Sequence, residues 1–224
     1  MRTRLGLAFF VLLSICFVSS VSASIVVHTS DFIANGTRSC FNGFEAIPIA
    51  GDGIHFSGGG GPYAEGGITV EQIGGDAGND IWVKYFFPEG INGWYPDGGD
   101  FGFTRITKTD GSDFVNLGMT RGTGYFADSK VAFDVRLNGV SQLTGTLFTP
   151  GGGAPVYLGF DGMPFDEVLL ADAPGIGFVG DGSLNAFAVD EIEVGSNAVP
   201  EPSSFALLGL GVVALCGYGW RKRK

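Results

Sequence analysis

The chain of 224 residues is acidic, with 23 Asp and Glu against 13 Lys and Arg and a formal net charge of −10. A charge of this sign repels nucleic-acid phosphates and anionic membrane surfaces, so neither is an expected partner. Glycine and phenylalanine are both abundant, with 39 and 20 residues. Many glycine turns between aromatic-rich segments are typical of all-β domains, and the phenylalanine content argues against a disordered chain.

The N-terminus has the pattern of a secretory signal peptide. Arg2 and Arg4 form a positive segment, residues 5–18 are mostly apolar, and Ala23 ends a run of small residues. Signal peptidases recognise these three parts in this order. We therefore expect signal peptidase to remove residues 1–23 by cleavage between Ala23 and Ser24, so that the remaining chain is exported. An uncleaved N-terminal anchor is the alternative.

Residues 24–197 are predicted to form one all-β domain, an antiparallel β-sandwich or jelly roll. Short apolar runs broken by Gly, Asp, Asn and Pro recur about a dozen times, at the spacing of strands and turns. Several alternate cleanly: within residues 131–137, four apolar side chains face one way, while Asp134 and Arg136 face the other. Strands of this kind bury one face each, which favours two packed sheets.

The predicted domain is more acidic than the whole chain and has few cysteines. Without residues 1–23 and 200–224, seven of the thirteen cations and twenty-two of the twenty-three acids remain, which gives about −15. Cys40 is the one cysteine left, because Cys16 lies in the signal peptide and Cys216 near the C-terminus. A single thiol forms no internal disulfide, so we expect the apolar core to stabilise the domain and Cys40 to be a buried structural residue.

Two groups of residues are candidates for binding. Glu45 follows an early strand and Asp190 lies in the last one, in "GFE" and "AVDEIEV". These segments are similar to those of carbohydrate-binding jelly rolls that join their first and last strands through a structural Ca²⁺, an ion that prefers oxygen ligands. This calcium is the one cofactor considered, and solvent-facing acids are the alternative.

The second group lies in the segment "INGWYPDGGDFG", whose Gly, Pro and Asp residues predict a loop. Trp94 and Tyr95 are candidates for an exposed platform on which a sugar ring stacks, and Asp97 and Asp100 for hydrogen bonds to its hydroxyls. The alternative is that these aromatic rings belong to the core.

Catalysis has little support, and we expect no enzyme. A zinc site or a Ser-His-Asp triad needs histidines in suitable positions. The chain has two, His28 and His55, and both lie in strand-like runs. Glycoside hydrolysis by a pair of carboxylates remains an alternative, but nothing in the sequence selects one pair among the many acids.

The C-terminus has three parts: Pro200-Glu201-Pro202, an uncharged apolar stretch, and a basic end formed by Arg221, Lys222, Arg223 and Lys224. The uncharged residues 205–220 would span roughly 24 Å as a helix, so with flanking residues we expect a transmembrane helix over about 203–220. The basic end then lies on the cytoplasmic side of the inner membrane.

This arrangement over residues 198–224 resembles the bacterial PEP-CTERM sorting signal, a segment that is also labelled as an ice-binding protein C-terminal domain. The resemblance implies that an exosortase, a membrane-embedded transpeptidase, processes the chain near Pro-Glu-Pro. It also implies release from the inner membrane to the cell surface or exterior, and an association with exopolysaccharide and biofilm. We therefore expect an exported surface or matrix protein. The alternatives are a carbohydrate-binding module for exopolysaccharide and a jelly-roll glycoside hydrolase or polysaccharide lyase.

Overall fold

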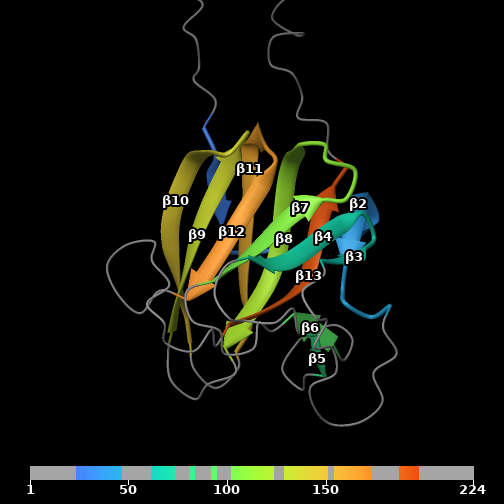
Figure 1. Ribbon diagram of the computed structural model, residues 1–224, viewed down its shortest axis with the longest axis vertical. Helices are drawn as coiled ribbons and strands as arrows, with labels where there is room; N and C mark the ends of the chain where they lie inside the picture. Colours follow the sequence, from blue (N-terminus) through green and yellow to red (C-terminus); the bar gives the residue numbers. More distant parts are fainter. Residues whose placement is uncertain are drawn as a thin grey trace, which may run out of the picture.

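The computed structural model describes residues 24–46, 62–73, 81–83, 92–94, 102–123, 129–150, 154–172 and 187–196 (Figure 1). These residues form an all-β domain of two antiparallel sheets, as the alternating sequence pattern predicts. Apart from one 3₁₀ turn, η1 (Asn35–Thr37), the described secondary structure consists of the following strands: β1 (Val26–His28), β2 (Arg38–Asn42), β3 (Tyr63–Glu65), β4 (Ile68–Ile73), β5 (Ile81–Val83), β6 (Asn92–Trp94), β7 (Phe103–Lys108), β8 (Phe114–Thr123), β9 (Ser129–Leu137), β10 (Val140–Thr149), β11 (Val156–Phe165), β12 (Glu167–Asp172) and β13 (Phe187–Gly195).

The two sheets divide the strands between them without following the chain order. The first sheet has seven strands in the order β1-β11-β8-β13-β6-β5, with β2 also paired to β13. The second sheet has six, in the order β10-β9-β12-β7-β4-β3. The last strand, β13, thus lies inside the first sheet between β8 on one side and β2 and β6 on the other. Segments from both ends of the domain meet on this sheet.

The core lies between the sheets. It is built from the side chains that face inward on each strand, where inward and outward side chains alternate. On β9, Val131, Phe133 and Val135 are buried in it, which confirms the predicted alternation. Aromatic rings join the layers: Phe133 of the second sheet lies 5.2 Å from Phe160 of the first, centroid to centroid. Asp134 faces outward as predicted but is buried, because the Arg136 guanidinium lies over it with an Nε–Oδ2 distance of 2.6 Å.

The expectation that Trp94 is an exposed platform is wrong. Its side chain is fully buried and its ring lies 6.2 Å from that of Phe44. The indole Nε1 donates a hydrogen bond of 3.1 Å to Oγ1 of Thr104 on β7, so this side chain links the first sheet to the second. A buried indole needs such a partner for its N–H group. The Gly and Pro residues around it predict a loop, but β6 places the ring between the sheets.

Several predicted segments lie outside the described residues. They include the signal peptide with Ala23, the sorting signal 198–224 and the predicted helix 203–220. Within the residues that the structure describes, no helix has the length and apolar character needed to cross a membrane.

Replacing Trp94 with alanine should cost about 3–5 kcal/mol of unfolding free energy, because it leaves a cavity and removes the link to Thr104. Val115 on β8, which is 37% exposed, is the matched control. Val115→Ala should change stability by no more than about 0.5 kcal/mol. Urea unfolding of both variants measures this, and a Trp94→Ala cost no larger than that of Val115→Ala would show that the ring is not part of the core.

Candidate functional site

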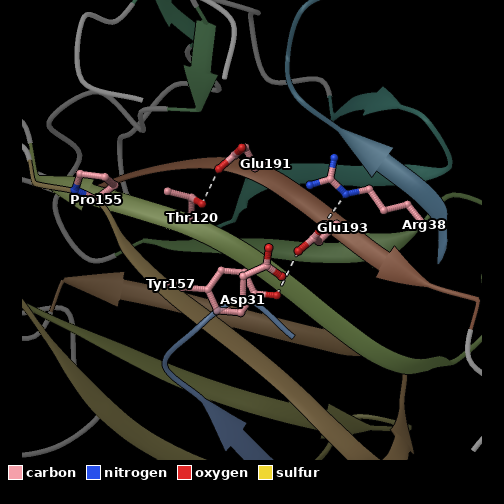
Figure 2. Close-up of a pocket in the computed structure, with 7 residues that line it drawn as sticks. All are labelled: Asp31, Arg38, Thr120, Pro155, Tyr157, Glu191 and Glu193. Carbon is pink, nitrogen blue, oxygen red and sulfur yellow. Dashed lines mark hydrogen bonds and ion pairs between the residues drawn. The ribbon is translucent and has the colours of Figure 1, made fainter. Parts of the chain in front are cut away.

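A polar depression of about 260 Å³ lies on the outer face of the first sheet (Figure 2). We call it the carboxylate pocket, because three acids line it together with one cation. Its lining residues are Asp31, Arg38, Thr120, Pro155, Tyr157, Glu191 and Glu193. They come from β2, β8, β11 and β13, from the segment between β1 and η1, and, for Pro155, from the residue just before β11. The floor is therefore a rigid sheet, which suits a binding site.

Strand register brings these side chains together. Thr120 on β8 lies opposite Tyr157 of β11 on one side and Asp190 of β13 on the other. Two residues earlier, Gly118 lies opposite Glu193. Because side chains alternate along a strand, this outward row is separate from the core row that contains Leu117 and Met119.

Glu193 is the anchor of the carboxylate pocket. Its side chain is only 2% exposed, and it accepts hydrogen bonds from Nε of Arg38 at 2.5 Å and from the Tyr157 hydroxyl at 3.0 Å. Burial raises the pKa of Glu193 above its ordinary value, although both donors act in the opposite direction. Burial of the Tyr157 hydroxyl, together with the nearby Glu193 charge, raises the pKa of Tyr157. Tyr157 is thus a hydrogen-bond donor to Glu193 at neutral pH.

Gly118 makes the contact between Tyr157 and Glu193 possible. A Cβ atom at this position would collide with the Tyr157 hydroxyl and come within 3.2 Å of Oε1 of Glu193. The tyrosine ring therefore lies across β8 where any other residue would block it. This close approach explains why a glycine stands in the middle of a ten-residue strand.

Glu191 reaches the carboxylate pocket through a break in the β13 ladder. The pairing with β8 shifts between Asp190 and Glu193, and Glu191 has a φ of +49°, which is left-handed and strained for glutamate. The Asp190 Oδ1 atom accepts a 2.7 Å bond from the Glu191 amide, which stabilises this conformation. The Glu191 carboxylate then accepts a 2.5 Å hydrogen bond from the Thr120 hydroxyl. A bulge that turns a side chain toward a depression is typical of functional sites.

Aromatic rings flank the carboxylate pocket on the β1 side. His28 stacks on Phe32 with 4.0 Å between the ring centroids, and Phe32 meets Tyr157 edge-on at 6.2 Å. Both Phe32 and Tyr157 are half-buried, so part of each ring stays accessible. The site therefore combines hydrogen-bonding carboxylates with aromatic surface.

The outer face of the second sheet is organised differently. Arg105 on β7 contacts Glu71 and lies 3.8 Å from Glu167, which is itself 3.7 Å from Arg136. A larger and more open depression of about 390 Å³ includes Arg105 and Glu167. Acids and cations alternate across these strands, so this face is a network of ion pairs without an excess of carboxylates.

The two residues predicted to bind calcium, Glu45 and Asp190, both adjoin β6. The Glu45 Oε1 atom accepts a 2.8 Å bond from the amide of Asn92 on β6. Asp190 is fully buried and follows Val189, which pairs with Trp94 of β6. Across the described part of the chain, no three His, Cys, Asp or Glu side chains form a group that could hold a metal. Calcium at Glu45 and Asp190 stays a prediction.

The other sugar-platform residues, Tyr95, Asp97 and Asp100, lie outside the described residues. The sequence does not predict the carboxylate pocket, because its residues are far apart along the chain and the bulge at Glu191 breaks the alternation of side chains along β13. The available signal was Glu191 and Glu193 in "VDEIEV", two acids at the spacing of one strand face.

Comparison with known proteins identifies the C-terminal segment. Residues 198–224 match the family model of the PEP-CTERM protein-sorting motif. The chain carries a PEP-CTERM sorting motif. This confirms the resemblance seen in Pro200-Glu201-Pro202 and the basic end. A search of curated protein sequences finds no match.

Solved structures give two distant similarities. One is the enzymatically active domain of tailspike protein 4 from bacteriophage CBA120, at 13% identity and a TM-score of 0.37, covering 58% of this chain and 19% of the tailspike. The other is a family 11 carbohydrate-binding module from Clostridium thermocellum, solved in complex with a β-1,3-1,4-mixed-linked tetrasaccharide. It matches at 12% identity and a TM-score of 0.32, covering 65% of this chain and 96% of the module.

The raised pKa of Glu193 predicts a pH-dependent contribution to stability. The folded protein holds the Glu193 proton more tightly than the unfolded chain, whose value is near the ordinary 4.5. Stability therefore decreases as the pH rises from about 4.5 through the folded-state pKa, where the buried group becomes charged. Glu193→Gln removes this titration, so wild type should gain stability relative to the variant as the pH falls through this window.

Urea unfolding of both proteins between about pH 4 and pH 8 measures this difference, in which most other titrations cancel. A wild type that loses stability relative to Glu193→Gln on acidification would contradict the prediction. It would show that the ion pair with Arg38 outweighs the burial of the carboxylate.

Proposed function

We propose that this chain is an exported surface or matrix protein that an exosortase sorts through its C-terminal motif, and that its β-sandwich binds a polysaccharide. The sorting part rests on one observation, the match of residues 198–224 to the PEP-CTERM motif. Export through a signal peptide at residues 1–23 is part of the same proposal, because the sorting signal acts on chains that reach the inner membrane.

The carboxylate pocket supports the binding part. Sugar hydroxyls are donors and acceptors, and the pocket offers both: the acids Asp31 and Glu191 accept, while Arg38 donates. The faces of sugar rings are apolar, and the half-buried rings of Phe32 and Tyr157 provide apolar area beside these groups. The floor formed by β8, β11 and β13 holds the polar groups in fixed positions. This combination is what recognition of an uncharged polyol requires.

Charge restricts the class of ligand. Three carboxylates and one guanidinium line the carboxylate pocket, and residues 24–199 carry about −15. An anionic polymer would be repelled both at long range and at the pocket. We therefore propose a neutral polysaccharide, such as a cell's own exopolysaccharide, and binding without turnover.

The sorting proposal predicts the ends of the mature protein. Mass spectrometry of the protein recovered from the cell exterior should show Ser24 as the first residue and no residues from the segment after Pro202. An exported chain that keeps Arg221 to Lys224 would contradict exosortase processing. Deleting the exosortase gene of the producing cell should leave the full tail in place.

The binding proposal predicts that Glu191→Gln weakens binding to neutral glucans by about tenfold, which corresponds to about 1.4 kcal/mol. The amide keeps the shape and the bond from Thr120 but loses a charged acceptor. Glu167→Gln, a change of the same kind on the opposite sheet, is the matched control and should bind like wild type.

Affinity electrophoresis in gels containing a neutral glucan or an anionic uronate polymer measures both variants. Equal weakening by the two changes, or preference for the anionic polymer, would contradict the proposed site. Release of reducing sugars by wild type would instead show a hydrolase.

A further inference from the structure

Strand β10 is the terminal strand of the second sheet, and it is unusual for an edge. It pairs with β9 on one side, and within the described residues no strand pairs with its other side. Its sequence, "VSQLTGTLFT", extends over ten residues with no charge and no proline. Of the other strands that pair on one side alone in the described residues, β1, β5 and β3 have three residues each, and β2 has five and begins with Arg38. Edges are normally short or carry charges or proline, which prevents pairing with another chain.

The part of β10 beyond its bulge is regular, and the Phe148 carbonyl there already accepts a hydrogen bond of 3.3 Å from Nη2 of the buried Arg121 of β8. A bulge between Ser141 and Leu143 interrupts its register with β9, and from Leu143 to Thr149 each residue has one partner on β9. On the outward side of this stretch, Thr144, Thr146 and Phe148 are all exposed. Phe148 is 53% exposed, which leaves a large apolar ring in solvent. Figure 1 shows β10 at the edge of the second sheet.

We propose that β10 pairs antiparallel with β10 of a second copy of this chain, about a two-fold axis at Thr146. This register pairs all of the regular residues 143–149 and none beyond the bulge. Phe148 of each copy then lies opposite Thr144 of the other, and the two Thr146 side chains face each other. Aromatic–β-branched and Thr–Thr pairs both stabilise antiparallel strands.

A second copy fits this edge better than a foreign chain. A two-fold interface brings the same strand from both sides, so it requires a self-complementary surface. An uncharged strand meets this requirement, because no like charges come together when it pairs with itself. The strong negative charge of the domain acts at longer range and is screened at physiological salt, where the Debye length is about 8 Å.

The inference goes beyond the proposed function and does not depend on it. The residues that line the carboxylate pocket belong to the first sheet and its neighbouring segments, and none belongs to β10. Pairing through β10 therefore leaves both pockets open. Two pockets on one dimer would bind a repeating polymer with a higher avidity than one.

The first test measures the oligomeric state of the full chain in mild detergent by sedimentation velocity at about 0.15 M salt. Wild type should sediment as a dimer. Thr146→Lys places two ammonium groups opposite each other and should give a monomer with an unchanged melting curve, since the side chain is exposed. Val140→Lys adds the same charge to the same strand before the bulge and should remain a dimer.

A wild type that stays monomeric up to about 100 μM would overturn the proposal, since specific homodimers usually form at lower concentrations. A dimer that Thr146→Lys leaves intact would overturn it as well, because the interface would then lie elsewhere.

The second test fixes the register by disulfide formation in a chain whose Cys16, Cys40 and Cys216 are replaced by serine. Residues opposite each other in antiparallel strands have Cα atoms about 4.5–5.5 Å apart, within the range of a disulfide. Thr146→Cys should therefore form a covalent dimer under mild oxidation. The two copies of Thr144 would be about 13 Å apart, so Thr144→Cys should not. Equal cross-linking at both positions, or at Thr144 alone, would overturn this register.

Discussion

The burial of two apolar sheet faces against each other is the interaction on which this domain depends. Cys40 is a free thiol that packs against the core, so cross-links within the described residues do not hold the sheets together. The core is continuous from Phe133 and Phe160 near one end of the sheets to Trp94 and Phe44 near the other. Trp94 matters more than its place on a three-residue strand indicates, because it joins the sheets through both its ring and its indole N–H group.

A core that fills the space between the sheets leaves their outer faces free to differ. On the second sheet, Arg105 and Arg136 neutralise the acids around them. On the first sheet, one guanidinium, that of Arg38, lies among three carboxylates. This arrangement is unfavourable at two residues. Glu193 is buried, which raises its pKa, and the backbone of Glu191 has a left-handed conformation. Folding alone does not require a buried carboxylate or a strained backbone at these positions. The carboxylate pocket is therefore the best candidate for a binding site.

The fold could be predicted from the sequence because alternation reports burial directly. The residues of β9 alternate from Val131 to Leu137, and the structure confirms this segment as a strand. Trp94 could not be placed in this way, since the Gly and Pro residues around a short strand resemble those of an exposed loop. The carboxylate pocket could not be predicted for another reason. Tyr157 and Glu193 meet through the non-sequential strand order β11-β8-β13, and Gly118 permits their contact without any sequence signature.

We propose that a neutral glycan binds on the outer face of the first sheet. Amide chemical shifts of the isotope-labelled protein, followed during titration with a neutral oligosaccharide, test it most directly. We expect saturable shift changes concentrated around Thr120, Tyr157 and Glu191, on β8, β11 and β13. Shift changes centred on Arg105 and Glu167 of the second sheet, or none with any neutral glycan, would contradict it.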